Sequence, residues 1–175
     1  MFHVSPEHAE KFPLKLPIPH WSTQNRVLVN DQPVPEVKPG AYLTLDREWK
    51  PGDTIEMNLD MSLHYWAGEK ECTCKTSIYR DPLLLVYEFP RNGDQTKPEF
   101  DTAMMKEKIV PANGELATPM LLLEINDTAG KPVRLRDYGT AGDRGIRYAS
   151  WLNVKNVKAT PFSEANPLRS SRSTQ

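Results

Sequence analysis

Proline is the residue type that most restricts what this chain can fold into. The 175 residues include 16 prolines against 9 glycines, and the prolines are spread along the sequence. A proline cannot donate a backbone hydrogen bond, and it breaks a helix when it lies in the helix interior. The spread therefore argues against long helices and predicts many short strands joined by turns.

A regular alternation between Thr54 and Met61 is the clearest strand pattern in the chain. Ile55, Met57, Leu59 and Met61 fall on one side, and the residues between them are polar. This alternation is typical of an antiparallel strand with one buried face. One face of this segment is therefore expected to lie in a core.

Two short apolar runs, Leu83–Phe89 and Met120–Ile125, have the length of strands that are buried on both faces. Turn sequences such as Pro39-Gly40 separate the remaining strand patterns. Further strands are predicted at Leu14–Leu16, Arg26–Asn30, Ala41–Leu45, Arg134–Tyr138 and Arg147–Val154.

Short strands with turns about every 10 residues predict an all-β fold, an antiparallel β-sandwich built as one unit or as two small units. At most one or two helical turns are expected, near residues 100–108. We predict a frayed or disordered start over 1–11, a first sandwich unit over 12–90, a second β unit or the remainder of the sandwich over 91–155, and a flexible tail over 156–175.

Charge and hydropathy exclude several classes of partner. The chain has 22 basic and 23 acidic residues, so no basic patch for nucleic acid is expected. No apolar run approaches the roughly 18 residues of a membrane helix. The first residues, MFHVSPEHAEKF, lack the apolar core of a signal peptide, which makes a cytoplasmic location the default expectation for the sequence as it stands.

The carboxylates offer no evident catalytic pair. Most fall in turns or on polar strand faces, where a solvated charge is the favoured interpretation. Glu88 is the exception, because it lies inside an apolar run and needs a partner, for which Arg80 and Arg147 are candidates. The carboxylates considered are Asp53, Asp60, Glu88, Asp127, Asp137 and Asp143.

Motifs for other chemistries are also missing. The chain has no G-x-S-x-G elbow, no phosphate loop and no dinucleotide-binding glycine pattern. The glycine-bearing stretch YGTAGDRG, residues 138–145, is better interpreted as a tight surface loop. We therefore expect no catalytic residue and no cofactor in this chain.

Two cysteines, Cys72 and Cys74, form a C-x-C pair whose thiols would share one face if the segment were a strand. A zinc site needs further ligands, and the four histidines do not bring metal-like spacing, although His64 can be close in space. A structural or incidental role is favoured over a metal or redox role, and no metal site is expected.

Aromatic residues leave two interpretations open, because an exposed ring can stack on a sugar face and a buried ring packs in a core. Trp49 and Trp151 follow strand patterns and are expected in the core. Trp66 precedes a glycine turn and can be exposed. We keep Trp66 and Tyr138 as candidate carbohydrate contacts.

Five separate stretches, in order, resemble glycoside hydrolase family 127, the β-L-arabinofuranosidase-like enzymes. FPLKLPIPHW resembles the family's L-x-L-R-I-P-x-W strand, and VLVNDQPV its V-x-V-N-G-x-P-V hairpin. GAYLTLDREWKPGDTIEMNLDM resembles G-x-Y-x-x-I-x-R-x-W-x-x-G-D-x-V-x-L-x-L-P-M, and SIYRDPLLLVYE resembles S-I-Y-R-G-P-L-L-L-x-Y-D. LRDYGTAGDRGIRYASWLNV resembles the closing strands. The resemblance covers about residues 12–154.

In that family these stretches belong to C-terminal β-sandwich domains that follow a helical (α/α) barrel. The resemblance implies that catalysis, by a zinc-bound cysteine and a glutamate, lies in the barrel. None of the barrel motifs occurs here, and Cys72 and Cys74 match no catalytic position. The chain alone is therefore expected to be a non-catalytic accessory segment that packs on a barrel, and the alternatives are a free-standing carbohydrate-binding sandwich and an enzyme with an unrecognised site.

The chain departs from the family pattern in two places. Asp81 stands where the pattern has glycine, which would strain the backbone if φ is positive there. Family sandwiches also carry strands before the one aligned at Phe12, so an open sheet edge is expected here, in the sheet of Leu14–Ile18 or at Leu83–Phe89. Such an edge can take a catalytic barrel partner or a second copy of the chain.

Overall fold

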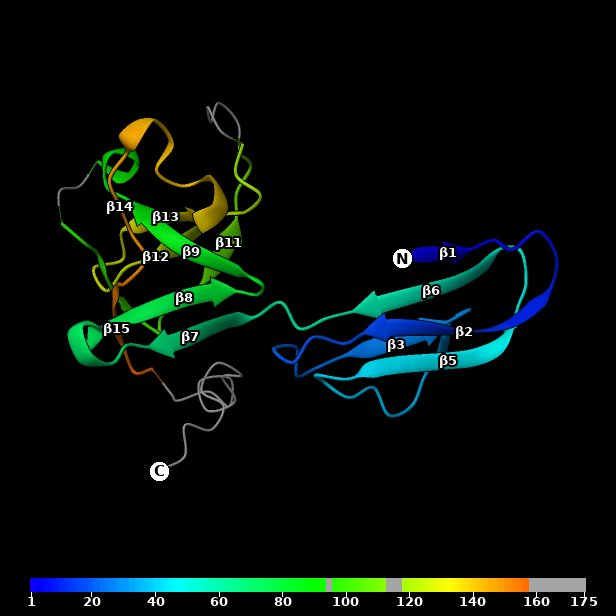
Figure 1. Ribbon diagram of the computed structural model, residues 1–175. Coiled ribbons are helices and arrows are strands. Elements are labelled where there is room, and N and C mark those ends of the chain that lie inside the picture. Colours follow the sequence, from blue (N-terminus) through cyan, green and yellow to red (C-terminus); the bar gives the residue numbers. More distant parts are fainter. Residues whose placement is uncertain (94–95, 113–117, 158–175) are drawn as a thin grey trace, which may run out of the picture. The chain divides into compact units, whose positions relative to one another are not determined.

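The computed structural model describes residues 1–93, 96–112 and 118–157, and within them the fold is all-β, as the sequence predicts (Figure 1). The chain divides into two compact units, Met1–Met61 and Ser62–Gln175. The helices of the described residues are short 3₁₀ turns, η1 (Lys70–Cys72), η2 (Pro90–Asn92), η3 (Tyr138–Thr140) and η4 (Asp143–Gly145). None of these is long and apolar enough to cross a membrane.

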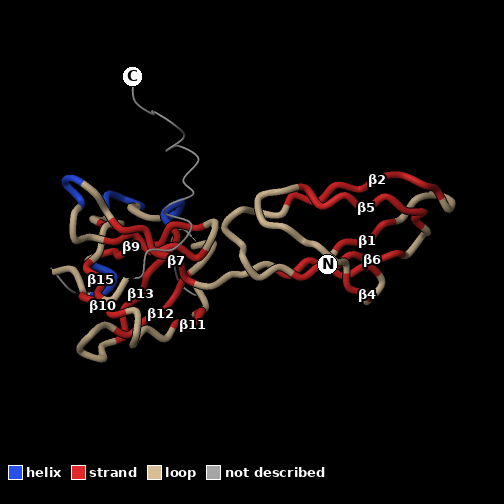
Figure 2. Tube along the Cα trace, turned by 90° about the horizontal axis from the view of Figure 1, so that it is seen from below, coloured by secondary structure: helices blue, strands red, loops and turns tan. Residues whose placement is uncertain are grey.

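The first unit is a small sandwich of two antiparallel sheets, shown as two layers in Figure 2. One sheet has the order β1-β6-β3-β4, and the other consists of β2 and β5. The strands are β1 (Phe2–Val4), β2 (Glu10–Pro17), β3 (Arg26–Val29), β4 (Gln32–Pro33), β5 (Tyr42–Trp49) and β6 (Asp53–Asn58). The sheets enclose a core formed by Leu16, Ile18, Val27, Val29, Leu45, Trp49 and Ile55.

A tight turn at Asn30-Asp31 fixes the β3–β4 hairpin. Both residues have positive φ, 49° and 63°, which a two-residue type I′ turn requires and which Asn and Asp tolerate well. The Asn30 amide also donates to Asp53 Oδ1 at 2.7 Å and accepts the Thr54 N–H at 2.8 Å. This side chain therefore ties the hairpin to the turn that starts β6.

The second unit is built around a sheet of order β11-β12-β13-β9-β8-β7, with β14 also paired to β9. A parallel pair, β10 and β15, lies outside this sheet, so the fold is antiparallel except there. The strands are β7 (Leu63–Ala67), β8 (Thr76–Arg80), β9 (Leu83–Glu88), β10 (Glu99–Asp101), β11 (Glu107–Ile109), β12 (Leu122–Asn126), β13 (Pro132–Asp137), β14 (Tyr148–Ala149) and β15 (Asn153–Lys155). Its core contains only residues of this unit, among them Ile78, Tyr87, Leu123 and Leu135.

The predicted boundary near residue 90 differs from the structural one between Met61 and Ser62. The reason is long-range pairing, because β9 joins β13 through Leu135↔Tyr87 and Asp137↔Leu85. Strands β7 to β9 therefore share a sheet with the later part of the chain.

The start of the chain, predicted to be frayed over residues 1–11, instead forms β1 and the beginning of β2. Phe2–Val4 form β1, which pairs with β6 through Phe2↔Ile55, and Glu10 already begins β2. Val4 packs against the core of the first unit. A three-residue strand at a sheet edge is specified by its partner, so local sequence does not reveal it.

No α-helix is assigned near residues 100–108, where at most one or two helical turns were expected: β10 ends at Asp101 and β11 begins at Glu107. Between them the chain makes a turn, in which the Asp101 carbonyl accepts the Met104 N–H at 2.9 Å and the Met105 N–H at 3.0 Å. The bond from Met105 to Asp101 closes a single helical turn, and strands flank it. Most of the predicted tail over 156–175 lies outside the described residues.

Candidate functional site

Glu88, the one carboxylate expected to need a partner, lies at the centre of a buried ionic network in the second unit. Its Oε2 is 2.6 Å from Arg91 Nε and 3.2 Å from Arg136 Nη1, and its Oε1 accepts the Gly142 N–H at 2.9 Å. Glu88 is 1% exposed and Arg136 is 2% exposed. A buried charge of this kind is tolerated because it is paired and hydrogen-bonded.

The structure gives Glu88 two arginine partners that were not predicted, Arg91 and Arg136. The predicted Arg80 is 3.8 Å from Glu107, and the Arg147 guanidinium lies 4.0 Å from the centroid of the Phe89 ring. Arg91 follows Glu88 by three residues in the turn after β9, so local sequence could have suggested it. Arg136 lies opposite Val86 on β13, and only the strand register brings it to the carboxylate.

Asp137 extends the same network by closing a loop. Its Oδ2 accepts the Met120 N–H at 2.8 Å and the Thr140 hydroxyl at 2.9 Å, and its Oδ1 accepts the Thr140 N–H at 3.0 Å. Thr140 Oγ1 also accepts from Arg136 Nη2 at 3.1 Å. Asp137 thus joins the start of η3 to the chain before β12 and is engaged as a structural acceptor.

The space beside this network is too small for a substrate. A cavity of about 30 Å³ is lined by Glu88, Arg91, Asn92, Leu122, Arg134 and Arg136. Such a volume is near that of one water molecule. The network therefore organises the loops around β9 and β13 and has no room for a sugar ring.

The remaining candidate carboxylates lie at the start of a strand, as Asp53 does in β6, or in the segments between strands. A hydrogen bond from the Lys50 N–H, then one from Asn30, lowers the pKa of Asp53 below its ordinary value of 3.8. Asp127 Oδ1 accepts the Ala129 and Lys131 N–H groups, and Asp60 Oδ2 accepts the Thr23 hydroxyl at 3.0 Å. Asp143 begins η4. These interactions shape turns and bring no two of these carboxylates together.

His64 and Asp81 form a second buried ionisable pair, which sequence reasoning did not identify. His64 Nε2 is 3.3 Å from Asp81 Oδ2, and the two residues are 9% and 3% exposed. Burial, followed by the charge of Asp81, raises the pKa of the neighbouring Tyr79. Asp81 is not among the described residues with positive φ, so the backbone does not require the glycine of the family pattern. Its carboxylate instead faces His64.

The cysteines lie in a turn rather than in a strand. Cys72 ends η1, and Cys74 follows in a left-handed conformation with φ of 64°. Both are free thiols, Cys72 half-buried and Cys74 exposed. No group of three or more His, Cys, Asp or Glu side chains that could hold a metal occurs within residues 1–93, 96–112 and 118–157.

The aromatic candidates differ in exposure. Trp66 is half-buried on β7, and Tyr138 is 50% exposed and packs edge to face on Tyr148 with ring centroids 5.8 Å apart. A hydrogen bond with Tyr138 raises the pKa of Tyr148. Trp49 is fully buried as predicted, whereas Trp151 is only half-buried. Trp66 and Tyr138 therefore remain candidate carbohydrate contacts that differ in exposure.

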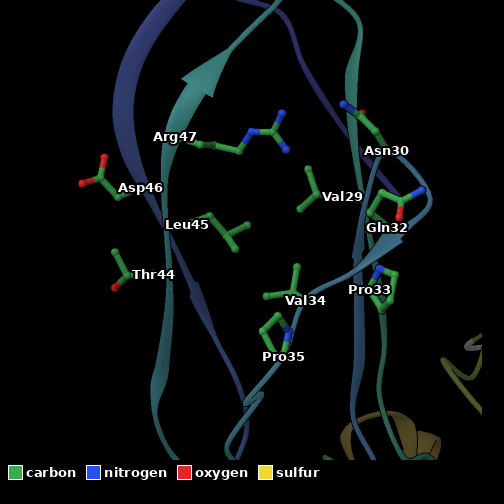
Figure 3. A pocket seen from close by; sticks show the side chains of 10 residues that line it. All are labelled: Val29, Asn30, Gln32, Pro33, Val34, Pro35, Thr44, Leu45, Asp46 and Arg47. Atoms are coloured by element: carbon green, nitrogen blue, oxygen red, sulfur yellow. The ribbon is translucent and has the colours of Figure 1, made fainter.

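Two open hollows flank the two-stranded sheet of the first unit. The β5 groove, with a volume of about 520 Å³, lies between β5 and the β3–β4 hairpin (Figure 3). The β2 groove, of about 390 Å³, lies between β2 and β1 with Ile55 of β6. Among the described strands, β2 and β5 pair only with each other, so the sheet of Leu14–Ile18 has open outer edges, whereas β9 is flanked by β8 and β13.

Comparison with known proteins matches the first unit to a described family. The family described as "Beta-L-arabinofuranosidase, GH127 middle domain" matches residues 1–61, and these are the residues of the first structural unit. The search of curated proteins finds no match.

Solved structures resemble most of the chain. A protein described as a glycoside hydrolase has a TM-score of 0.69 and 23% identity, over 87% of this chain and 29% of its own. A GH127 β-L-arabinofuranosidase from Geobacillus stearothermophilus T6 has a TM-score of 0.70 and 22% identity, over 87% and 28%. A GH127 β-arabinofuranosidase has a TM-score of 0.66 and 22% identity, over 83% and 28%.

The chain spans less than a third of the length of these solved structures, and at these identities the likeness shows the fold. The family match over the first unit and the shared fold over most of the chain point the same way. The resemblance drawn from the sequence is therefore confirmed: this chain resembles part of the β-sandwich region of glycoside hydrolase family 127, and its first unit matches the middle domain of that family.

Proposed function

We propose that this chain is a non-catalytic accessory segment of a family 127 type glycoside hydrolase, which packs on a catalytic barrel and supports it. The observation that carries the proposal is the match of residues 1–61, the whole first unit, to a GH127 middle domain. The solved relatives hold the same fold as less than a third of a longer chain. A region that accompanies further domains in its relatives is a natural support for them.

The polar clusters of the described residues favour a supporting role over an independent site. Glu88 and Asp137 are saturated by arginine and backbone donors, and the cavity beside Glu88 is about 30 Å³. An enzyme site needs a pocket that holds substrate against an acid, base or nucleophile. The ionic network instead resembles the interior of a structural domain.

The test is complex formation with a family 127 catalytic barrel that lacks its own sandwich region. We expect the two purified proteins to co-migrate in size-exclusion chromatography, and the barrel to melt at a higher temperature with the chain than without it. This follows because a partner that binds only the folded state stabilises it. Separate migration together with an unchanged barrel melting temperature would contradict the proposal.

A second function, carbohydrate binding by a free-standing module, is favoured by one observation, the exposed Tyr138–Tyr148 pair. Exposed rings can stack on a sugar face, and GH127 relatives are named for arabinofuranosides. This function predicts that affinity electrophoresis in an arabinan gel retards the chain and that Tyr138→Ala abolishes the retardation. Trp66→Ala, measured in the same assay, tests the half-buried second candidate.

A further inference from the structure

The flanks of the β2–β5 sheet are not equivalent, because proline removes donors from some strand edges and not from others. In an antiparallel pair, backbone groups alternate between those that face the partner strand and those that face away. The Ile18 N–H donates to the Ala41 carbonyl at 2.9 Å, which places Ile18 in the set that faces β5. In this register, the backbone N–H and C=O groups of even-numbered β2 residues face β5, and those of odd-numbered β2 residues face the open edge.

Two of the outward positions of β2, Pro13 and Pro17, are prolines and offer no N–H. Proline in a sheet is tolerated where its missing N–H would have faced solvent, and it blunts that edge against further pairing. The opposite wall of the β5 groove, formed by the β3–β4 hairpin and the residues after it, also lacks free backbone donors at its prolines. The Val34 N–H bonds back to the Val27 carbonyl, and its neighbours Pro33 and Pro35 have none.

The outer edge of β5 keeps its donors. The same register turns the backbone groups of Tyr42, Thr44, Asp46 and Glu48 away from β2, and none of these residues is a proline. The described strands pair β5 only with β2. This edge therefore presents the N–H groups of four residues of an eight-residue strand. Of the outward carbonyls, that of Glu48 also accepts from Arg47 Nε at 3.3 Å.

The groove beside this edge specifies the side chains of an added strand. Figure 3 shows Leu45 pointing across the groove toward Val29 and Val34, with Arg47 reaching across it near Val29. Inward-facing residues of an added strand would therefore meet apolar side chains around Leu45 and the Arg47 side chain beyond them. Asp46 and Glu48 are exposed on the opposite face of β5. On its occupied side, β5 already sets Glu48 against Lys11 of β2. Opposite charges are the favoured cross-strand neighbours.

We propose that the outer edge of β5 binds an extended polypeptide segment of a partner, one that alternates apolar residues with lysine or arginine, by strand addition. A second copy of this chain fits less well, because pairing two β5 strands would set Asp46 and Glu48 of each against those of the other. The proposal goes beyond the accessory role, because it names the strand edge that binds and the alternation of residues in the bound segment. It does not depend on which polypeptide supplies that segment.

The probe is a capped synthetic peptide that alternates valine and lysine and has the eight residues of β5. Amide hydrogen exchange by NMR should show slowed exchange at Thr44, Asp46 and Glu48 on binding, with no slowing at the outward β2 residues Lys11 and Lys15. The matched peptide of valine and glutamate should bind about tenfold more weakly, because two favourable charge pairs become repulsive.

Two substitutions opposite each other in the register separate the edges. Thr44→Pro removes a donor from the open edge of β5 and should abolish peptide binding, whereas Lys15→Pro alters β2 and should leave binding intact. The double variant Asp46→Lys, Glu48→Lys keeps the backbone and should reverse the preference, so that the glutamate peptide binds more tightly. This variant decides the matter even if Thr44→Pro does not fold.

Three results would overturn the proposal: no slowing of exchange at any β5 amide at the highest soluble peptide concentration, equal effects of the two proline variants, or dimerisation of the free chain through β5. None of these results depends on a catalytic barrel, so they are distinct from failure of the proposed function.

Discussion

The buried Glu88–Arg136 pair is where a single side chain matters most for stability. Both residues are at most 2% exposed, and Glu88 also holds Arg91 and the Gly142 N–H. Removing one partner of a buried pair leaves an uncompensated charge, which typically costs about 3–5 kcal/mol. Glu88→Ala should therefore lower the free energy of unfolding by about that amount in urea titrations.

The matched control for Glu88 is Glu124→Ala on β12. Glu124 pairs with Arg134 at 3.6 Å, but the side chains are 30% and 57% exposed. An exposed pair is typically worth less than about 1 kcal/mol, so this variant should melt close to the parent chain. Equal losses in the two variants would show that the Glu88 network is not the structural centre described above.

Asp53 should make the first unit sensitive to acid. Its folded pKa lies below the ordinary value of 3.8, because the Lys50 N–H and Asn30 bind the ionised carboxylate. A carboxyl group whose pKa is lower in the folded state stabilises the fold at pH values above its ordinary pKa. That stabilisation is lost as the pH falls through the pKa of the folded state. The melting-temperature advantage of the parent chain over Asp53→Asn should thus be full at neutral pH, begin to decline as the pH approaches 3.8, and be lost as the pH falls further through the lower folded pKa. A difference that does not change with pH would contradict this account.

At the scale of elements, the two units have separate cores. The first cluster contains residues up to Met57, and the second begins at Leu63. A compact region with its own core can in principle fold alone. We therefore expect a fragment that begins at Ser62 to give a β-type circular dichroism spectrum and a cooperative melt. A fragment that remains unfolded in buffer would show that the second unit needs the first.

Sequence patterns located β6 and β9. The alternation at 54–61 yields β6 with Ile55 fully buried, but the strand ends at Asn58 and Met61 is exposed. The apolar run at 83–89 yields β9 with Leu85 and Val86 fully buried. The eight-residue strands β2 and β5 were found only in part, at 14–16 and 41–45. The family resemblance located the open edge in the sheet of β2 as one of two possibilities.

Features that depend on pairing distant segments could not be read locally. Strand pairing sets β1, the unit boundary at Met61 and the contact of Arg136 with Glu88. The His64–Asp81 pair left a partial signal, because an aspartate stands in place of the family's glycine. Only the register, which places Leu63 opposite Arg80, brings the two side chains together.

At the scale of the whole molecule, the chain combines a GH127-like fold with polar clusters that are used internally. The described carboxylates close turns or neutralise arginines, and the cavity at Glu88 is too small for a sugar. The open features of the described residues include the exposed tyrosine pair and the grooves beside β5 and β2. We propose that they are surfaces for a partner.

The most direct test of this account is a hydrolysis assay of the purified chain with an aryl β-L-arabinofuranoside. We predict release of the aryl alcohol at the rate of the buffer blank, because Glu88 and Asp137 are held by arginine and backbone donors and the cavity beside Glu88, of about 30 Å³, cannot hold the sugar. Turnover that rises in proportion to the concentration of the chain, and that is lost in a folded Glu88→Gln variant, would contradict the account.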